Sequence, residues 1–461
     1  MDKRLTATHG MWQPFLAAIV ALALVMTLGA TSASAASPSA CRVQNTVTSK
    51  TYTVLQAAVD AAKKDDRLTV RGTCHGTTVI SRDLVIEGVL GRGVDRSLLD
   101  GDGRGVVLTV KESVAVTVTD LTIRGGRGLL REGGPRTPWL RPAGVENGGM
   151  LTLQGVTVRR NVGLGVHNTG TLLLRGDTRI DINGANEHVG VVSTGTLRLN
   201  GTATIRQNNV AVRNWGTLVL DGSSSLHNNS LAIENLGTAT LNDNSRIDDF
   251  AWGVRNAGTL TLNDSSKIRG LYRPVTRGYV GVTNSGTLTL NARSRITDNG
   301  IGVDNTGTLT LNDTGQVSGN QTGVANTGHL TLNGSSAIRD NHRAPPLDCY
   351  GSNCSAPAVG AGVTNTGTVV MNDSSTISGN TLHDSRNGSY GGGVHMMRDP
   401  SLPEPPSLTM TGSATISGNS ASDKGGGIYA SADSILSGVN CGPQTLANVY
   451  GNTPDDCHVE P

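Results

Sequence analysis

The sequence predicts an all-β protein that folds as a right-handed parallel β-helix with coils of about 21 residues. Near-copies of the segment Gly302–Asn312 recur along most of the chain, and six of nine successive separations are 21 residues. Apolar and polar residues alternate within each copy, and this period of two is typical of strands. The chain has 61 Gly among 461 residues and only 3% aromatic residues. Such a composition suits short strands joined by tight turns.

The first 36 residues have the features of an export signal. Lys3 and Arg4 precede an apolar run from Phe15 to Ala30, and small residues around Ala35 provide a cleavage site. No later segment approaches the roughly 18 apolar residues of a membrane helix. We therefore expect a secreted or cell-surface protein without a membrane span after cleavage. Its expected parts are the signal at 1–36, an N-terminal cap with the first coils at 37–143, the repetitive β-helix at 144–440 and a C-terminal cap at 441–461.

A short amphipathic helix is predicted near the start of the mature chain, over Thr53–Lys64. Its apolar residues fall on one helical face: Val54, Leu55, Ala58, Val59 and Ala62. Runs rich in β-branched residues then predict the first strands, at Leu68–Val70, Leu84–Ile86, Val106–Val110 and Val114–Ile123. We expect the helix to cover the open edge of the first coil, because an uncovered edge would pair with other chains.

From Gly144 onward each period contains three short apolar pieces. The "GVxN" piece has a β-branched residue two positions before its Asn, the "GTLTLN" piece has an alternating Leu pair such as Leu309 and Leu311, and the "SxIxxN" piece has a central Ile. Three strands within 21 residues make one coil of a solenoid.

The Asn of the GVxN piece is predicted to form a ladder. Stacked coils place like residues over like at a spacing of about 4.8 Å, so the side-chain amides of this column are able to hydrogen-bond along the axis. Ser193 occupies the same slot in one coil. The predicted ladder consists of Asn147, Asn168, Asn214, Asn235, Asn256, Asn284, Asn305, Asn326 and Asn365.

The six cysteines form three local pairs along the sequence. Several connectivities are formally possible, but the separation of the pairs along an extended fold favours three short bridges. These are Cys41 with Cys74, Cys349 with Cys354 and Cys441 with Cys457. No pair has Cys-x-x-Cys spacing or a His at ligand spacing, so we expect disulfides and no metal site.

The departures from the 21-residue period are insertions, and most leave the coil between an SxIxxN piece and the next GVxN piece. Aromatic and basic residues gather there, and such side chains suit an extended glycan or a protein partner. The predicted ligand-binding residues at this corner are Trp139, Arg136, Arg141, Trp252, Tyr272, Arg273, Tyr279, Tyr350 and Tyr390. The alternative is that bulky side chains collect in loops only because they do not fit the tight coils.

At one outward-facing position beside this corner, the type of side chain differs from coil to coil. It lies between the buried Val and the Asn of GVxN, and His167, Arg213 and Arg255 at this position complete the predicted binding residues. Glu146 precedes His167 by one coil, and a carboxylate beside an imidazole is able to support acid–base chemistry. A solvent-facing position without any function would vary in the same way.

The repeat pattern resembles the right-handed parallel β-helix superfamily typified by pectate lyases and polygalacturonases, over nearly all of the mature chain. The segments Ile416–Ala421 and Gly425–Tyr429 are similar to the paired short motifs of the chlamydial polymorphic membrane proteins, a family of surface adhesins. Gly391–Val394 repeats the second motif after Ile377–Asn380. The resemblance implies the solenoid architecture and, through the adhesin motifs, a role in surface binding.

The catalytic motifs of the enzymes in that superfamily are incomplete here. The Asn-x-Asp and Arg-x-Lys motifs of polygalacturonases, whose carboxylates act on the glycosidic bond, are missing from the sequence. Arg136–Arg141 matches the Arg-x-Pro-x-x-Arg of pectate lyases but lacks the preceding calcium-binding carboxylates. With 38 basic and 36 acidic residues, net charge gives no argument for a nucleic-acid partner.

We therefore predict a non-enzymatic, adhesin-like protein without a cofactor, which binds a glycan or a protein partner through the loop corner. Two alternatives remain: a polysaccharide lyase or glycoside hydrolase with an unrecognised site, and a structural filament of the cell envelope.

Overall fold

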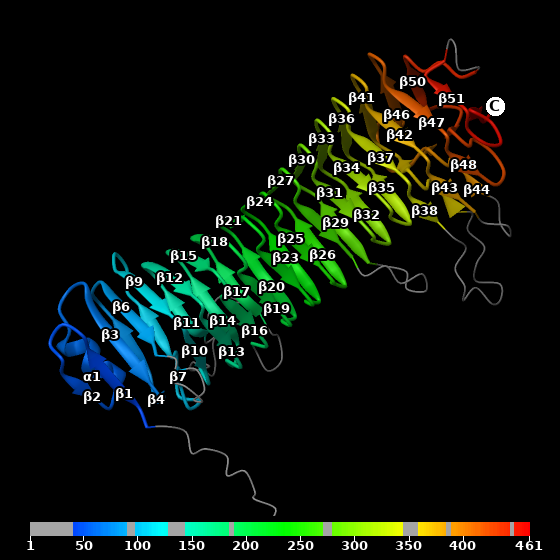
Figure 1. Cartoon of the computed structure of the whole chain (residues 1–461). Helices are drawn as coiled ribbons and strands as arrows, with labels where there is room; N and C mark the ends of the chain where they lie inside the picture. Colours follow the sequence, from blue (N-terminus) through cyan, green and yellow to red (C-terminus); the bar gives the residue numbers. More distant parts are fainter. Residues whose placement is uncertain are drawn as a thin grey trace, which may run out of the picture. The chain divides into compact units, whose positions relative to one another are not determined.

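The computed structural model describes residues 40–89, 97–127, 143–183, 189–270, 279–343, 358–383, 389–442 and 447–461. Residues from Ser39 to the C-terminus form one compact unit. Within the described residues the chain winds into a parallel β-helix with one short α-helix, which confirms the predicted fold class (Figure 1). The predicted export signal lies outside these residues.

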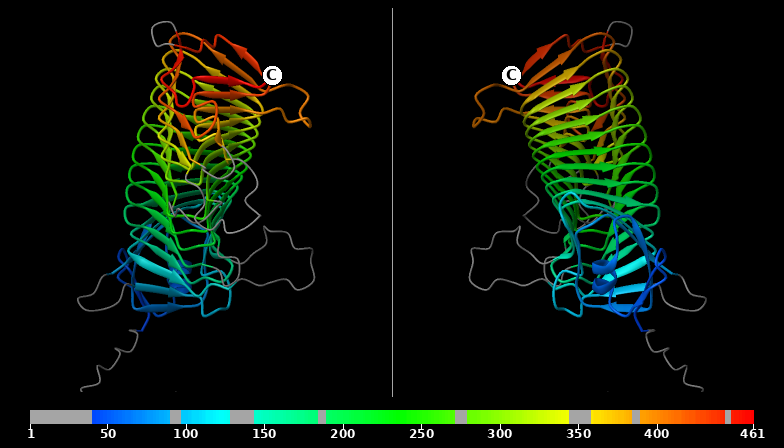
Figure 2. Two further views of the ribbon diagram at one scale, coloured as in Figure 1. Left: turned by 90° about the vertical axis from the view of Figure 1, so that its right-hand side faces the viewer. Right: turned by 90° about the vertical axis from the view of Figure 1, so that its left-hand side faces the viewer.

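Three long sheets make up the solenoid, with 17, 15 and 15 strands, and strands of successive coils lie side by side (Figure 2). Sheet I contains the GTLTLN pieces, sheet II the SxIxxN pieces and sheet III the GVxN pieces. The strands of sheet I, in spatial order, are β2 (Thr51–Tyr52), β1 (Arg42–Asn45), β3 (Asp66–Arg71), β6 (Leu84–Gly88), β9 (Ala115–Thr119), β12 (Met150–Gln154), β15 (Thr171–Arg175), β18 (Thr196–Leu199), β21 (Thr217–Leu220), β24 (Thr238–Leu241), β27 (Thr259–Leu262), β30 (Thr287–Leu290), β33 (Thr308–Leu311), β36 (His329–Leu332), β41 (Thr368–Met371), β46 (Ser407–Met410) and β50 (Ile435–Ser437).

Sheets II and III follow sheet I within each coil. The strands of sheet II are β4 (Thr73–His75), β7 (Ser97–Asp100), β10 (Leu121–Arg124), β13 (Thr157–Arg159), β16 (Arg179–Asp181), β19 (Thr204–Arg206), β22 (Ser225–His227), β25 (Arg246–Asp248), β28 (Lys267–Arg269), β31 (Arg295–Thr297), β34 (Gln316–Ser318), β37 (Ala337–Arg339), β42 (Thr376–Ser378), β47 (Thr415–Ser417) and β51 (Val449–Tyr450). The strands of sheet III are β5 (Thr78–Ile80), β8 (Leu108–Val110), β11 (Ala143–Asn147), β14 (Leu164–Asn168), β17 (Val189–Ser193), β20 (Val210–Asn214), β23 (Leu231–Asn235), β26 (Trp252–Asn256), β29 (Val280–Asn284), β32 (Ile301–Asn305), β35 (Thr322–Asn326), β40 (Val363–Asn365), β45 (Val394–Met396), β49 (Ile428–Ala430) and β52 (Cys457–Val459).

Short strands at the corner between sheets II and III form two small additional sheets. One contains β38 (His342–Arg343), β43 (Thr381–Leu382) and β48 (Ser420–Ala421), and the other contains β39 (Ala358–Val359) and β44 (Ser389–Tyr390).

The bore of the solenoid is filled by columns of identical or similar apolar residues. Leu309 and Leu311 of β33 lie in register with Leu288 and Leu290 of β30, and all four side chains are fully buried. Because strand side chains alternate between the two faces, the Leu pairs of each GTLTLN piece point inward and the Thr residues between them point outward.

The N-terminal end of the solenoid is covered by a helix, whereas the predicted C-terminal cap contributes strands β51 and β52 to sheets II and III. Helix α1 spans Leu55–Ala61 and packs its buried residues against the first coil, so it is shorter than predicted. Val54 lies at the N-cap and is 49% exposed, which corrects its assignment to the buried face. The disulfides Cys41–Cys74 and Cys441–Cys457 are present, whereas Cys349 and Cys354 lie outside the described residues.

The first strands differ from the sequence prediction at two places. Strand β1 pairs antiparallel with both β2 and β3, so the N-terminal cap adds two strands to sheet I that the periodicity did not predict. The predicted strand Val114–Ile123 is divided into β9 and β10 at Asp120, whose φ of 53° lies in the left-handed region. A continuous strand cannot accommodate this backbone conformation.

The predicted asparagine ladder is confirmed in sheet III. Within it, Asn284 Nδ2 donates to Asn305 Oδ1 at 2.7 Å, and Asn305 Nδ2 donates to Asn326 Oδ1 at 2.8 Å. The same pattern links the other ladder residues, with distances of 2.7–2.8 Å between asparagines. Ser193 Oγ accepts a hydrogen bond from Asn168 Nδ2 at 3.0 Å. Asn214 Oδ1 has no hydrogen-bond partner, so the ladder is interrupted between Ser193 and Asn214.

Two further ladders are present that the sequence analysis did not identify. The Asn of the SxIxxN pieces forms a second buried ladder, in which Asn299, Asn320 and Asn341 donate to the next coil at 2.8–3.0 Å. This ladder ends at Asn452, whose Nδ2 donates to Asp456 Oδ1 at 3.0 Å. A third, half-buried ladder runs along the edge of sheet I, where each Asn donates to the preceding coil at 2.8–2.9 Å. Its members are Asn242, Asn263, Asn291, Asn312, Asn333 and Asn372.

We expect Asn305→Ala to destabilise the solenoid far more than Asn312→Ala. Removing Asn305 leaves Asn326 Oδ1 without its donor, takes one acceptor from Asn284 Nδ2 and removes two hydrogen bonds to backbone carbonyls, at a cost of about 2–4 kcal/mol. Water is able to replace the half-buried Asn312, so its removal should cost about 1 kcal/mol or less. Urea denaturation with amide hydrogen exchange across the central coils would measure both, and equal losses would contradict the assigned roles of the two ladders.

Candidate functional site

The loop corner lies between sheets II and III. In the described residues, β10 precedes β11 across an insertion, and the same holds for β16 and β17, β28 and β29, β37 and β40, and β42 and β45. In each case a strand of sheet II comes before the insertion and a strand of sheet III after it. Six predicted binding residues lie outside the described residues: Arg136, Trp139, Arg141, Tyr272, Arg273 and Tyr350.

An exposed aromatic and cationic surface occurs where β26 begins. Trp252 is 41% exposed, and the guanidinium carbon of Arg255 lies 5.4 Å from the centre of its ring. This distance is within the range of a cation–π contact. Tyr279, which is half-buried, directly precedes Val280, the strand partner of Trp252. The structure therefore brings three of the predicted residues to neighbouring coils, and we call them the Trp252 surface.

The outward column of sheet III contains ion pairs between neighbouring coils. Glu146 and His167 are strand partners, with 3.7 Å between Oε1 and Nδ1, and Arg213 Nε donates to Glu234 Oε2 at 2.9 Å. The hydrogen bond from His167 lowers the pKa of Glu146. A general acid requires a carboxyl pKa that is raised, so the geometry of this pair matches a surface ion pair.

Tyr390 has a different environment from the one the sequence suggested. Its ring stacks on Tyr429 at 4.9 Å between centroids, and Tyr429 also stacks on His395 at 5.2 Å and on His458 at 5.5 Å. The Tyr429 hydroxyl donates to Glu460. Tyr390 is thus part of a packed column of rings near the C-terminus, several coils away from the Trp252 surface. Phe250, another aromatic residue at the corner, belongs to the buried core.

His395 is the most unusual titratable residue of this ring column. It is 1% exposed, and neither ring nitrogen has a hydrogen-bond partner in the structure. Burial lowers the pKa of His395 to about 4, against a smaller opposite effect of Glu460. The imidazole is therefore neutral at neutral pH, and protonating it in the folded protein is unfavourable.

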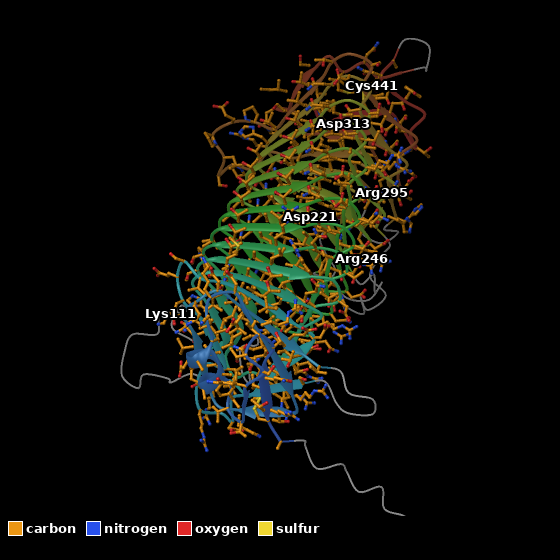
Figure 3. All side chains as sticks on the ribbon, turned by 60° about the vertical axis from the view of Figure 1, so that its left-hand side comes forward. Lys111, Asp221, Arg246, Arg295, Asp313 and Cys441 are labelled. Carbon is orange, nitrogen blue, oxygen red and sulfur yellow. A yellow bond between two sulfur atoms is a disulfide. The ribbon has the colours of Figure 1, made fainter. Side chains whose placement is uncertain are left out.

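A second variable column was missed, on the outer face of sheet II. Two buried carboxylates there each contact two arginines. Asp181 Oδ1 lies 3.7 Å from Arg159 Nε, and Asp181 Oδ2 lies 3.4 Å from Arg206 Nη2. Asp248 Oδ2 lies 3.0 Å from Arg246 Nε, and Asp248 Oδ1 lies 3.3 Å from Arg269 Nε. Arg246 and Arg295 project from the same side of the solenoid (Figure 3). Charged residues on both sides of the central Ile of SxIxxN were the sequence signal for this column.

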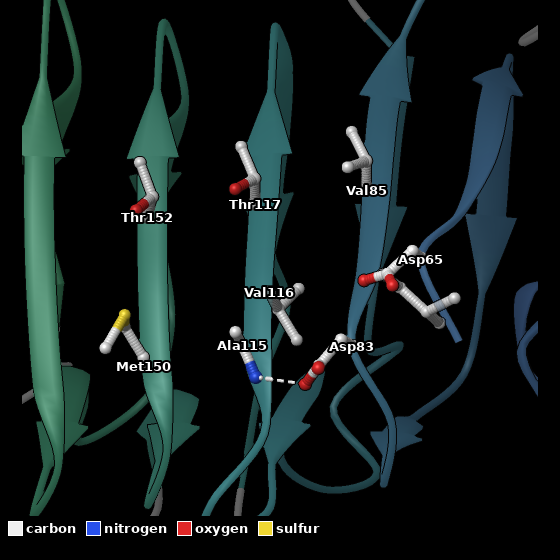
Figure 4. A pocket seen from close by; sticks show the side chains of 9 residues that line it. Asp65, Asp83, Val85, Ala115, Val116, Thr117, Met150 and Thr152 are labelled. Carbon is white, nitrogen blue, oxygen red and sulfur yellow. Dashed lines mark hydrogen bonds between the residues drawn. The ribbon is translucent and has the colours of Figure 1, made fainter.

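One shallow pocket of about 230 Å³ lies on the outer face of sheet I near the N-terminus (Figure 4). Met150, Thr117 and Val85 line it together with Asp65 and Asp83. The Asp83 carboxylate already has two partners, because it accepts a hydrogen bond from the N–H of Ala115 at 2.7 Å and forms an ion pair with Lys64 at 3.2 Å.

The described residues contain no group of three or more side chains suited to hold a metal ion. In the same residues, no helix has the length and apolarity needed to cross a membrane.

We expect His395→Phe to reduce the acid sensitivity of the protein. The pKa of His395 is depressed in the folded state, so its contribution to unfolding appears as pH falls below about 6.5 and is complete near pH 4. The cost at pH 4 is on the order of 3 kcal/mol. Urea denaturation between pH 7 and 4 would measure it, with His458→Phe as the control in the same ring column. An unchanged pH dependence in His395→Phe would contradict this assignment.

No family model matches the chain, and a search of curated proteins also found no match. The similarity to pectin lyase-like enzymes and to adhesin repeats therefore remains a resemblance in sequence motifs. The function must be argued from the surfaces of the solenoid itself.

Proposed function

We propose that this protein is an extracellular, non-enzymatic β-helix protein of adhesin type, which binds a glycan through the corner between sheets II and III. The observation that supports this most directly is the Trp252 surface, where an exposed indole, a guanidinium and a tyrosine occur on neighbouring coils. Two disulfides are compatible with an oxidising extracellular environment.

The chemistry of the Trp252 surface suits a sugar ring. The C–H face of a pyranose packs on an aromatic ring, and the hydroxyl groups around its edge accept hydrogen bonds from a guanidinium. Arg255 is held over the Trp252 ring and remains exposed, so little side-chain freedom would be lost on binding. A rigid platform of this kind is suited to contact one or two sugar units.

The solenoid would extend such contacts along a chain. Successive coils present Arg213 with Glu234 and then Arg255 in the outward column beside the Trp252 surface. Each coil shifts the next side chain by about 4.8 Å. A linear glycan lying along the axis would therefore meet a new polar side chain at each coil, and weak contacts would add up.

The test is a glycan screen followed by variants at the Trp252 surface. We expect Trp252→Ala to weaken binding of the best glycan by about fivefold or more, because loss of a large aromatic contact costs at least about 1 kcal/mol. Leu236→Ala is the matched control, since Leu236 is apolar, 50% exposed and one coil away. Equal affinity of both variants would contradict the proposal. So would the release of unsaturated or reducing ends from the bound polysaccharide, which would establish an enzyme instead.

A further inference from the structure

The outer face of sheet I presents two parallel columns of threonines. Thr238 and Thr240 of β24 are in register with Thr259 and Thr261 of β27, and the pattern continues through Thr287 and Thr289 of β30 to Thr308 and Thr310 of β33. Eight threonines thus form a grid of four coils by two columns. The first column continues towards the N-terminus through Thr217, Thr196 and Thr171.

This grid faces solvent and has no charge. The threonines of the first column are exposed and those of the second are half-buried. Among the described residues, none of the eight hydroxyl groups makes a hydrogen bond to another side chain or to the backbone. The insertions leave the solenoid at another corner, between sheets II and III, so they do not start beside the grid.

The spacing of the grid is close to that of ice in both directions. In a tetrahedral lattice with hydrogen bonds of about 2.75 Å, second-neighbour oxygens lie about 4.5 Å apart and the perpendicular layer repeat is about 7.3 Å. The coils stack about 4.8 Å apart, and residues two apart in a parallel strand are separated by about 6.6 Å. Over four coils the mismatch accumulates to about 1 Å, which is a small part of one repeat.

The coils that carry the grid are also held in constant register by side-chain ladders, which a lattice-matching surface requires. Sheets of many strands normally twist, and flat ones are stabilised by side-chain ladders. The third asparagine ladder borders the grid directly, with Asn263, Asn291 and Asn312 joined at 2.9 Å. The buried ladder of sheet III fixes the same coils from inside. Hydrogen bonds of nearly constant length between equivalent residues keep the coil spacing uniform.

We propose that the outer face of sheet I binds ice, through the threonine grid of β24, β27, β30 and β33. Each hydroxyl donates one hydrogen bond and accepts others, and each methyl group excludes one water position. Together they order a layer of water at lattice spacing, which joins a growing crystal face. A protein attached in this way stops growth where it sits, and the crystal surface between attached molecules becomes curved and harder to extend.

The inference goes beyond the glycan proposal and uses a different face. Its main competitor is that threonine is simply favoured on an exposed strand surface. That explanation accounts for threonines in sheet I but predicts no effect on ice. The two proposals fail separately, because one depends on Trp252 and the other on side chains of sheet I.

The experiment compares the full secreted chain with Thr261→Tyr and Thr297→Tyr. Thr261 lies within the grid, whereas Thr297 is a half-buried outward threonine of β31 in sheet II. We expect the wild type and Thr297→Tyr to shape ice crystals and to separate freezing from melting temperature, measured by nanolitre osmometry. Thr261→Tyr should lose most of this effect, because a large ring within the grid would keep the neighbouring threonines away from the ice surface.

Circular dichroism and the urea midpoint of each variant would verify that both fold. Absence of crystal shaping and of hysteresis in the wild type would overturn the proposal. Retention of the full effect in a folded Thr261→Tyr would overturn it as well, as would equal losses in both variants. Inhibition of ice recrystallisation, measured on the same three proteins, provides a second readout with the same expected order.

Discussion

The structure depends on one constraint, which is that the buried asparagines of neighbouring coils must lie directly above one another. A buried amide without a partner is costly. Asn305 Oδ1 accepts from Asn284 and Asn305 Nδ2 donates to Asn326, so these two residues must lie directly above and below it. A shift of one residue would turn inward side chains outward and would break the ladder at once. The ladder therefore sets the register of sheet III, and the strands of the other sheets follow because they belong to the same coils.

This constraint leaves the outer surface free to differ between the three sheets. The inward columns repeat Val, Leu and Ile with little change, whereas the outward residues are threonines on sheet I, arginines with buried aspartates on sheet II and a mixture on sheet III. Insertions occur between one strand of sheet II and the next strand of sheet III. One rigid solenoid is thus able to present several distinct surfaces.

The fold could be predicted from the sequence because the 21-residue repeat corresponds to one coil of the solenoid. The column of Asn305 was predictable from spacing alone, since identical residues at 21-residue intervals must lie above one another in a solenoid. The environment of single side chains was not predictable in this way. Phe250 takes an asparagine slot and is buried, and Val54 lies at a helix cap and is exposed. The pattern around each residue does not distinguish these cases.

The candidate site was less predictable than the fold for a related reason. Trp252 and Arg255 belong to the same strand, and sequence reasoning placed Trp252 at the corner and Arg255 in the outward column beside it. The burial of His395 instead depends on rings from other coils, including Tyr429. The arginine pairs around Asp181 and Asp248 also join different coils. Contacts of this kind depend on how side chains lean across the sheet, which composition and period do not specify.

The direction of the asparagine hydrogen bonds gives the solenoid an electrical polarity. In both buried ladders each amide donates towards the C-terminus, so their dipoles add, whereas the half-buried ladder of sheet I donates towards the N-terminus. The buried columns therefore end in a partial positive charge at their last NH₂ group, much as a helix does at its N-terminus. Asp456 accepts from Asn452 at that end. Its carboxylate balances the dipole of the column, as an acidic cap balances that of a helix.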